Sequence, residues 1–277
     1  MDVREYRRQY EAELASHAHT AGTAKALGAA PESGSGDRIH RLLATLRNDK
    51  EPASARLAAL DALKAARFLT AHFAPYNADF LAALREIAKP GTDPELCESA
   101  LETLALDKDS YAQDVLRRGL ADPKTALVSA AKALQFLSHD DHAGVVDLAR
   151  DIFHKATDVG TKEEALRVLA SDPKSADLFT SLIKDKSQPR SLRALSATGL
   201  NFINPQRFAE AARAIATDDH DYDDIRATVI GALAHLKDAT HVPKDQSFVQ
   251  HVRELAAKTG STPLRAAVGR FMKRLQE

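Results

Sequence analysis

Three clusters of histidine and carboxylate side chains are the residues of this sequence whose types could do chemistry. They are His17 to His19, His139 to His142 and Asp218 to Asp224. Imidazole nitrogens and carboxylate oxygens are common ligands of metal ions, so a metal-dependent enzyme is one hypothesis. None of the clusters has the i, i+4 spacing that brings two ligands to one helix face. Because aspartates between helices usually cap helix ends, we predict solvated turns here and no metal site.

The run from Asp218 to Asp224 is the densest of these clusters. It resembles the acid-rich start of a calcium-binding loop, which requires Gly at its sixth position and Glu at its twelfth. Counting from Asp218, those positions hold Asp223 and Val229. The run therefore lacks two residues that a calcium loop needs.

The sequence also lacks the usual signatures of nucleophilic and nucleotide chemistry. Neither Gly-x-Ser-x-Gly nor Gly-x4-Gly-Lys-Ser/Thr occurs in it. Its one cysteine, Cys97, occupies an inward position of its predicted helix, so we expect a buried thiol and not a nucleophile. From these motifs we predict no catalytic residues, no cofactor and no enzymatic activity.

Seven recurrences of one pattern indicate how the chain is built. Each begins at a small, basic or apolar residue and closes on Leu or Met after further small and apolar residues. The units are Arg56 to Leu63, Cys97 to Leu104, Leu127 to Leu134, Lys162 to Leu169, Arg193 to Leu200, Arg226 to Leu233 and Arg265 to Met272. Their first residues are 41, 30, 35, 31, 33 and 39 positions apart. This spacing is typical of stacked helical repeats and predicts an all-α solenoid of about six to seven helix pairs.

The composition agrees with such a fold. Of the 277 residues, 44% are hydrophobic and only 5% are aromatic, with no Trp, which favours closely packed helices over β-sheets. The 38 Lys and Arg residues balance 39 Asp and Glu residues. No global positive field therefore attracts nucleic acid or an anionic membrane.

The N-terminal region differs from the repeats. Residues 2–16 have apolar side chains at helical spacing, and Pro31 to Gly36 has the composition of a flexible linker. We predict a helix and linker over residues 1–36 and the repeat solenoid over residues 37–277. The first residues form no secretory signal, and no apolar run approaches the ~18 residues of a membrane helix, so we expect a cytoplasmic location.

The repeats resemble the HEAT-repeat family over about residues 37–277. The resemblance lies in Asp122-Pro123 followed by Ala130 to Leu134, and in Arg-x5-(Ala/Gly)-Leu at three of the units. In that family an Arg early in the second helix of a pair often bonds the Asp of the preceding turn. By this resemblance the structural ladder residues are Arg56, Arg193, Arg226 and Arg265.

Two kinds of HEAT-like enzyme give further comparisons. Deoxyhypusine hydroxylase holds a di-iron centre with repeated His-Glu pairs, and this sequence has no His-Glu dipeptide. Alkylpurine DNA glycosylases of HEAT-like fold use aromatic residues, including Trp, on a basic face. With no Trp and a net charge of −1, this chain lacks the main residue type for stacking on a damaged base.

The charges predicted for the second helices suggest where a partner would bind. They are acidic early in the chain and basic late in it, which suits a protein with its own charge pattern better than a phosphate backbone. The candidate partner-binding residues are Glu98, Glu102, Lys132, Arg167, Arg270, Lys273 and Arg274. We therefore predict a non-catalytic scaffold or adaptor that binds a protein partner on its concave surface. The alternative is a nucleic-acid binder, similar to the glycosylases, that uses the basic C-terminal repeats.

Overall fold

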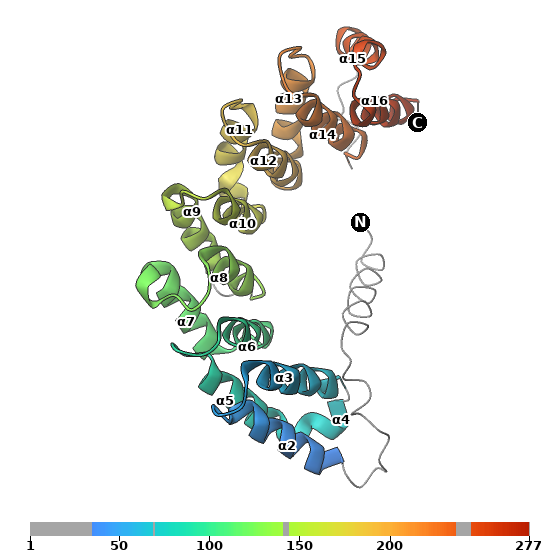
Figure 1. Cartoon of the computed structure of the whole chain (residues 1–277). Coiled ribbons are helices and arrows are strands. Elements are labelled where there is room, and N and C mark those ends of the chain that lie inside the picture. The colour runs from blue at the N-terminus through green and yellow to red at the C-terminus, as the bar shows by residue number, and fades with distance from the viewer. Residues whose placement is uncertain (1–34, 69, 141–143, 237–244, 277) are drawn as a thin grey trace. The chain divides into compact units, whose positions relative to one another are not determined.

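The fold is a succession of helix pairs (Figure 1). The structure, a computed structural model, describes residues 35–68, 70–140, 144–236 and 245–276. Within these ranges it contains fourteen α-helices of eight residues or more, one four-residue helix, three short 3-10 helices and no strand. The predicted all-α solenoid of about six to seven helix pairs is confirmed.

The chain divides into two compact units, residues 1–80 and 81–277. The first contains α2 (Ser35–Arg47), α3 (Ala53–Arg67), α4 (Thr70–Phe73), η3 (Ala74–Tyr76) and the start of α5 (Asn77–Ile87). The second continues with α6 (Pro94–Leu106), α7 (Ser110–Ala121), η4 (Pro123–Thr125), α8 (Ala130–Leu137), α9 (Val145–Lys155) and α10 (Val159–Leu169). It ends with η5 (Pro173–Ser175), α11 (Ala176–Lys184), α12 (Arg190–Ile203), α13 (Pro205–Ala216), α14 (Asp223–Ala234), α15 (Gln246–Lys258) and α16 (Thr262–Arg274).

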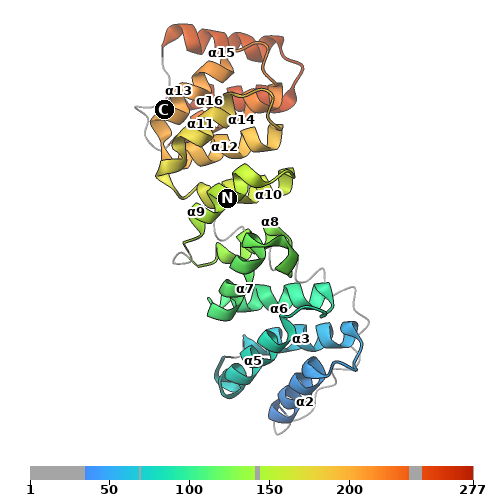
Figure 2. The same cartoon turned by 90° about the vertical axis from the view of Figure 1, so that its left-hand side faces the viewer.

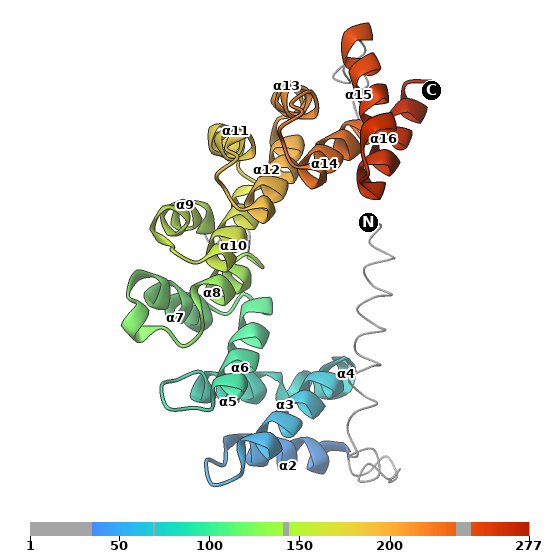
Figure 3. The ribbon, with the colours of Figure 1, turned by 45° about the horizontal axis from the view of Figure 1, so that its top comes forward.

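In the second unit the helices form two layers (Figures 1 and 3). The second helix of each pair packs on the second helix of the next, in the order α6, α8, α10, α12, α14 and α16. The first helices, α7, α9, α11, α13 and α15, form the other layer, which Figure 2 shows face on. All of the recurrences recognised in the sequence fall on second helices, although Leu127 to Ser129 precede the start of α8.

Polar caps explain where many of these helices begin. The Asp93 carboxylate accepts hydrogen bonds from the backbone N–H groups of Glu95 and Leu96, and Pro94 occupies the first position of α6. Asp109, Ser129, Asp158, Asn204, Asp245 and Ser261 cap α7, α8, α10, α13, α15 and α16 in the same way. Helix α2 begins at Ser35 and carries Asp37 in its first turn.

The predicted domain boundaries are not tested by this structure. Residues 1–34, which include His17 to His19 and most of the predicted N-terminal helix and linker, lie outside the described residues. Residues 237–244 lie outside them as well. The division into residues 1–80 and 81–277 is a feature that the sequence analysis did not anticipate.

The pair α11 and α12 is held closely together by a glycine. Gly199 on α12 faces the ring of Phe179 on α11, which is fully buried. A Cβ atom at position 199 would lie 2.9 Å from Cζ of that ring. Only glycine allows α12 to lie this close to Phe179, because moving a buried aromatic ring in a close-packed interior is energetically unfavourable.

Replacing Gly199 by Ala should therefore destabilise the protein, although Ala is the better helix former. We expect overpacking against Phe179 to cost about 1–3 kcal/mol of unfolding free energy, measured by chemical denaturation. Gly269 on α16 is the matched control, because it is exposed and a Cβ there would have no heavy atom within 4 Å. G269A should stabilise the protein by about 0.5–1 kcal/mol. Equal stabilisation by both substitutions would contradict the close contact.

A buried ion pair joins two successive repeats. The guanidinium of Arg193 on α12 donates to both carboxylate oxygens of Asp221, over 2.7 and 2.6 Å. Its Nε donates to the carbonyl of Ile183 over 3.0 Å. The two side chains are 0% and 2% exposed, so this pair is removed from solvent and fixes the turn before α14 against α12.

Asp221→Ala should be among the most destabilising single substitutions in the chain. It would leave the Arg193 charge buried without its partner, which typically costs about 3–5 kcal/mol. The matched control is Asp177→Ala, which removes an exposed pair with Arg207 (39% and 86% exposed). That control should cost at most about 1 kcal/mol. Thermal or urea unfolding of both variants measures the difference, and similar losses would contradict the burial of the Arg193 pair.

Candidate functional site

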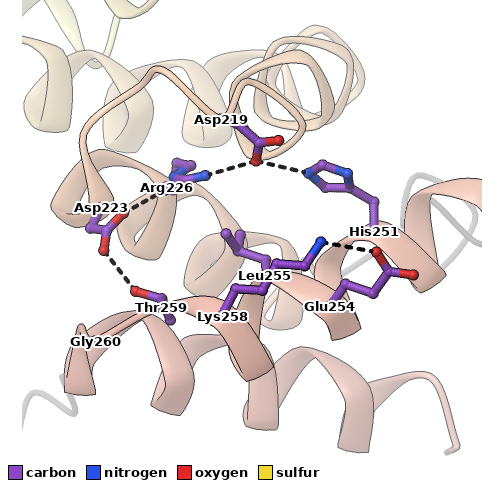
Figure 4. A pocket seen from close by; sticks show the side chains of 9 residues that line it. All are labelled: Asp219, Asp223, Arg226, His251, Glu254, Leu255, Lys258, Thr259 and Gly260. Carbon is purple, nitrogen blue, oxygen red and sulfur yellow. Dashed lines mark hydrogen bonds and ion pairs between the residues drawn. The ribbon is translucent and has the colours of Figure 1, made fainter.

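A polar cleft of about 410 Å³ opens between two of the C-terminal repeats. Its walls come from the turn before α14, the first turn of α14, one face of α15 and the turn that follows it (Figure 4). The lining residues are Asp219, Asp223, Arg226, His251, Glu254, Leu255, Lys258, Thr259 and Gly260. Five of these nine residues carry a formal charge and one is a histidine.

Helical spacing places the α15 side chains together. His251, Glu254 or Leu255, and Lys258 are separated by three or four residues, so they lie along one face of the helix. The other wall is held by the turn that Arg193 anchors through Asp221. The cleft is thus formed by a helix face and a turn whose backbone is fixed by buried contacts.

Arg226 is a buried residue of the cleft lining. Its side chain is 8% exposed and pairs with Asp219 (3.3 Å) and with Asp223. Its Nε atom, however, is buried and has no hydrogen-bond partner. A buried donor without a partner costs about 1–3 kcal/mol, so this atom would gain from an acceptor supplied by a ligand or by water.

His251 is the second residue of the cleft with an unsatisfied nitrogen. Its Nε2 lies 3.7 Å from Oδ1 of Asp219, which is too far for a hydrogen bond. The same Nε2 is buried and has no hydrogen-bond partner. Figure 4 shows Asp219 between the His251 ring and the Arg226 guanidinium, so one carboxylate faces both unsatisfied side chains.

The remaining carboxylates of the cleft are held ionised by their neighbours. Thr259 donates its hydroxyl to Asp223 over 2.7 Å, and this bond, together with that from Arg226, lowers the pKa of Asp223. A hydrogen bond from Gln250, followed by the contact with Lys258, lowers the pKa of Glu254. The Lys258 ammonium lies 3.4 Å from the Glu254 carboxylate.

The acidic run from Asp218 to Asp224 proves to be more than a solvated turn. Asp221 is 6% exposed, against the expectation of a solvent-facing carboxylate. The other carboxylates of the run bind basic side chains as well: Lys186 pairs with Asp218, Arg226 with Asp219 and Asp223, and Arg190 with Asp224. The burial of Asp221 was not predicted because its partner, Arg193, comes from the preceding repeat, which the local pattern does not show.

No group of three or more His, Cys, Asp or Glu side chains is arranged to hold a metal ion in the part of the chain that the structure describes. Within the second histidine cluster, Asp140 is described and accepts a hydrogen bond from Gln113, whereas residues 141–143 lie outside the described ranges.

The predicted partner-binding residues lie apart from this cleft. Glu98 on α6 and Lys132 on α8 are brought together in an ion pair of 3.0 Å. Arg167 instead pairs with Glu163 and Glu164 of its own helix. Glu102 lies on α6 beside Glu98, and Arg270, Lys273 and Arg274 lie on α16, where the first two are exposed and Arg274 is half-buried. Their role in binding stays a prediction.

The four predicted ladder arginines make different contacts. Arg56 donates to the carbonyl of Leu46 over 2.9 Å, and Arg193 makes the equivalent bond to a residue ten positions earlier. Arg226 pairs with Asp219 of the turn before its helix. Arg265 donates to the carbonyl of Thr259 over 2.9 Å. The ladder assignment itself stays a prediction from the family resemblance.

The Cys97 thiol is buried, as the sequence analysis predicted. Burial raises the pKa of this thiol, which disfavours the reactive thiolate. We expect a thiol reagent such as Ellman's reagent to leave Cys97 unmodified in the native protein and to modify it fully in guanidinium. Rapid stoichiometric reaction of the native protein would contradict the buried position.

His251, Glu254 and Thr259 were missed by sequence reasoning. The signal was present in the i, i+3 and i+7 spacing of His251, Glu254 and Lys258, which puts three titratable groups on one helix face. Such a face is usually solvated. Only the structure shows that the face closes against the turn that holds Asp219 and Asp223.

Comparison with known proteins leaves the family open. No protein-family model matches the chain, and no curated protein matches it either. Among solved structures, a match is the human deoxyhypusine hydroxylase in complex with glycerol, with 13% identity and a TM-score of 0.37. The match covers 88% of this chain and 98% of that one.

The functional prediction finds no support in these comparisons. The chain was predicted to be a non-catalytic scaffold, or alternatively a glycosylase-like nucleic-acid binder, whereas the matched structure is that of a hydroxylase, an enzyme. At this identity and TM-score the match assigns no substrate, cofactor or site residue to the present chain. No helix in the described ranges combines the length and the apolar character needed to cross a membrane.

Proposed function

We propose that the cleft between α14 and α15 binds a small polar ligand and that His251 exchanges a proton with it. The observation that supports this function is that two residues lining one cleft, Arg226 and His251, each have a buried nitrogen, Nε and Nε2, without a hydrogen-bond partner. Buried polar atoms in folded proteins are nearly always satisfied, so two such atoms in one cleft favour a group that completes them.

The chemistry of the two atoms is complementary. Arg226 remains charged and offers a donor, whereas histidine gains and loses its proton near neutral pH and serves as donor or acceptor. Binding together with proton exchange is an element of acid–base catalysis, and the proposal includes no covalent or redox step.

We also propose that the repeats belong to the HEAT-repeat class. Support comes from the Arg-x5-(Ala/Gly)-Leu pattern, whose members Arg56 and Arg193 make the same bond to a carbonyl ten residues earlier. In both cases the arginine lies early in the second helix of its pair.

The binding proposal is tested by observing the His251 ring directly. Protein with isotope-labelled histidine would be titrated with ammonium, carboxylate, amide and inorganic phosphate fragments, and the ring resonances followed by NMR. The His251→Asn variant assigns the signal. We expect saturable shifts of the His251 resonance with at least one class of fragment, because a ligand in the cleft must lie close to its ring.

The matched control is His154→Asn, on the exposed surface of α9. This variant should retain the shifts of the His251 resonance, whereas H251N should lower the affinity for the same fragment at least about tenfold, the equivalent of one charge-assisted hydrogen bond. If no fragment moves the His251 resonance at tens of millimolar concentration, the cleft is not a binding site.

A further inference from the structure

We infer that the ligand of this cleft is a cation, an ammonium or guanidinium group that is joined to an acceptor oxygen. This inference rests on the proposed binding function and adds the chemical class of the ligand. It follows from the charged side chains that line the cleft and from the ion pairs that they already form. It also follows from Arg226 Nε and His251 Nε2, which have no hydrogen-bond partner.

The charges of the cleft do not cancel. The lining includes three carboxylates, Asp219, Asp223 and Glu254, and two permanent cations, Arg226 and Lys258. Among these five charged side chains, three negative charges against two positive charges leave one negative charge. A cation would neutralise it, whereas an anion would add to it in a partly desolvated space.

Both permanent cations are already engaged. Arg226 pairs with Asp219 and Asp223, and Lys258 pairs with Glu254. An anionic ligand would have to compete with these carboxylates for the cations. A cationic ligand would instead use carboxylate oxygens that face the open side of the cleft.

Two carboxylates offer such oxygens beside the histidine. The side chain of Asp219 is 71% exposed and that of Glu254 is 49% exposed, so both keep accessible acceptor atoms. In Figure 4 they lie on opposite sides of the His251 ring.

Arg226 indicates that the ligand also carries an acceptor oxygen. Its side chain is more than nine-tenths buried and lines the cleft, and its Nε is a donor without an acceptor. A bare ammonium would leave this donor unsatisfied. A ligand that also carries a carbonyl or hydroxyl oxygen would satisfy it, and Leu255 would contact the carbon chain between the two polar ends.

The test is an isosteric series of probes measured by calorimetry and by the His251 ring resonance. The probe 4-aminobutanamide carries both an ammonium and a carbonyl. Pentanamide replaces the ammonium by a methyl group, succinamate replaces the whole aminomethyl end by a carboxylate, and n-butylammonium lacks the carbonyl. We expect 4-aminobutanamide to bind at least about tenfold more tightly than each of the other three, about the value of one charge-assisted interaction.

Substitutions then connect the preference to the cleft. Asp219→Asn removes the charge and keeps the shape, so it should weaken binding of 4-aminobutanamide at least about tenfold and change pentanamide binding little. Asp177→Asn, at an exposed site on α11, should leave both affinities unchanged. Circular dichroism and thermal unfolding of each variant separate lost binding from lost folding.

The outcomes distinguish the two proposals. Tighter binding of succinamate or inorganic phosphate would overturn the cationic ligand class and leave the cleft as a binding site. Equal binding of 4-aminobutanamide and n-butylammonium would overturn the requirement for an acceptor oxygen. No shift of the His251 resonance with any probe would overturn the binding function together with the ligand class.

Discussion

The buried ion pair between Arg193 and Asp221 is the constraint on which the C-terminal repeats depend. Removing two charged groups from water is unfavourable unless their hydrogen bonds are nearly complete, and here the guanidinium is bound bidentately by Asp221 and by the carbonyl of Ile183. The pair therefore fixes the position of the turn before α14. The neighbouring carboxylates of that turn are placed as a consequence, and Asp219 and Asp223 become one wall of the cleft.

The cleft differs from ordinary repeat junctions because its polar groups are incompletely paired. Elsewhere, exposed pairs such as that of Glu98 with Lys132 match one charge with one opposite charge. In the cleft an excess carboxylate coexists with two nitrogens that lack partners, Arg226 Nε and His251 Nε2. Consistency between local preferences and packing is the rule in folded proteins, and departures from it concentrate where a protein binds or reacts.

Much of the fold was predictable from the sequence and little of the site was. The recurrences from Arg56 to Met272 predicted the positions of the second helices, because each of these helices must bury an apolar face against its neighbours. The run from Asp218 to Asp224 was recognised as a turn, but the burial of Asp221 depends on Arg193, which lies 28 residues away in the preceding repeat. His251 was overlooked because it lies beside Asp219, which belongs to the preceding repeat. The spacing of residues within α15 does not predict this contact between repeats.

A crystal structure of the C-terminal repeats within the whole chain, at a resolution that shows ordered water, tests the central claim most directly. The account predicts an open cleft, with a water molecule or a ligand within hydrogen-bonding distance of Arg226 Nε and of His251 Nε2. It would be contradicted by a closed cleft in which both nitrogens bond to groups of the protein itself.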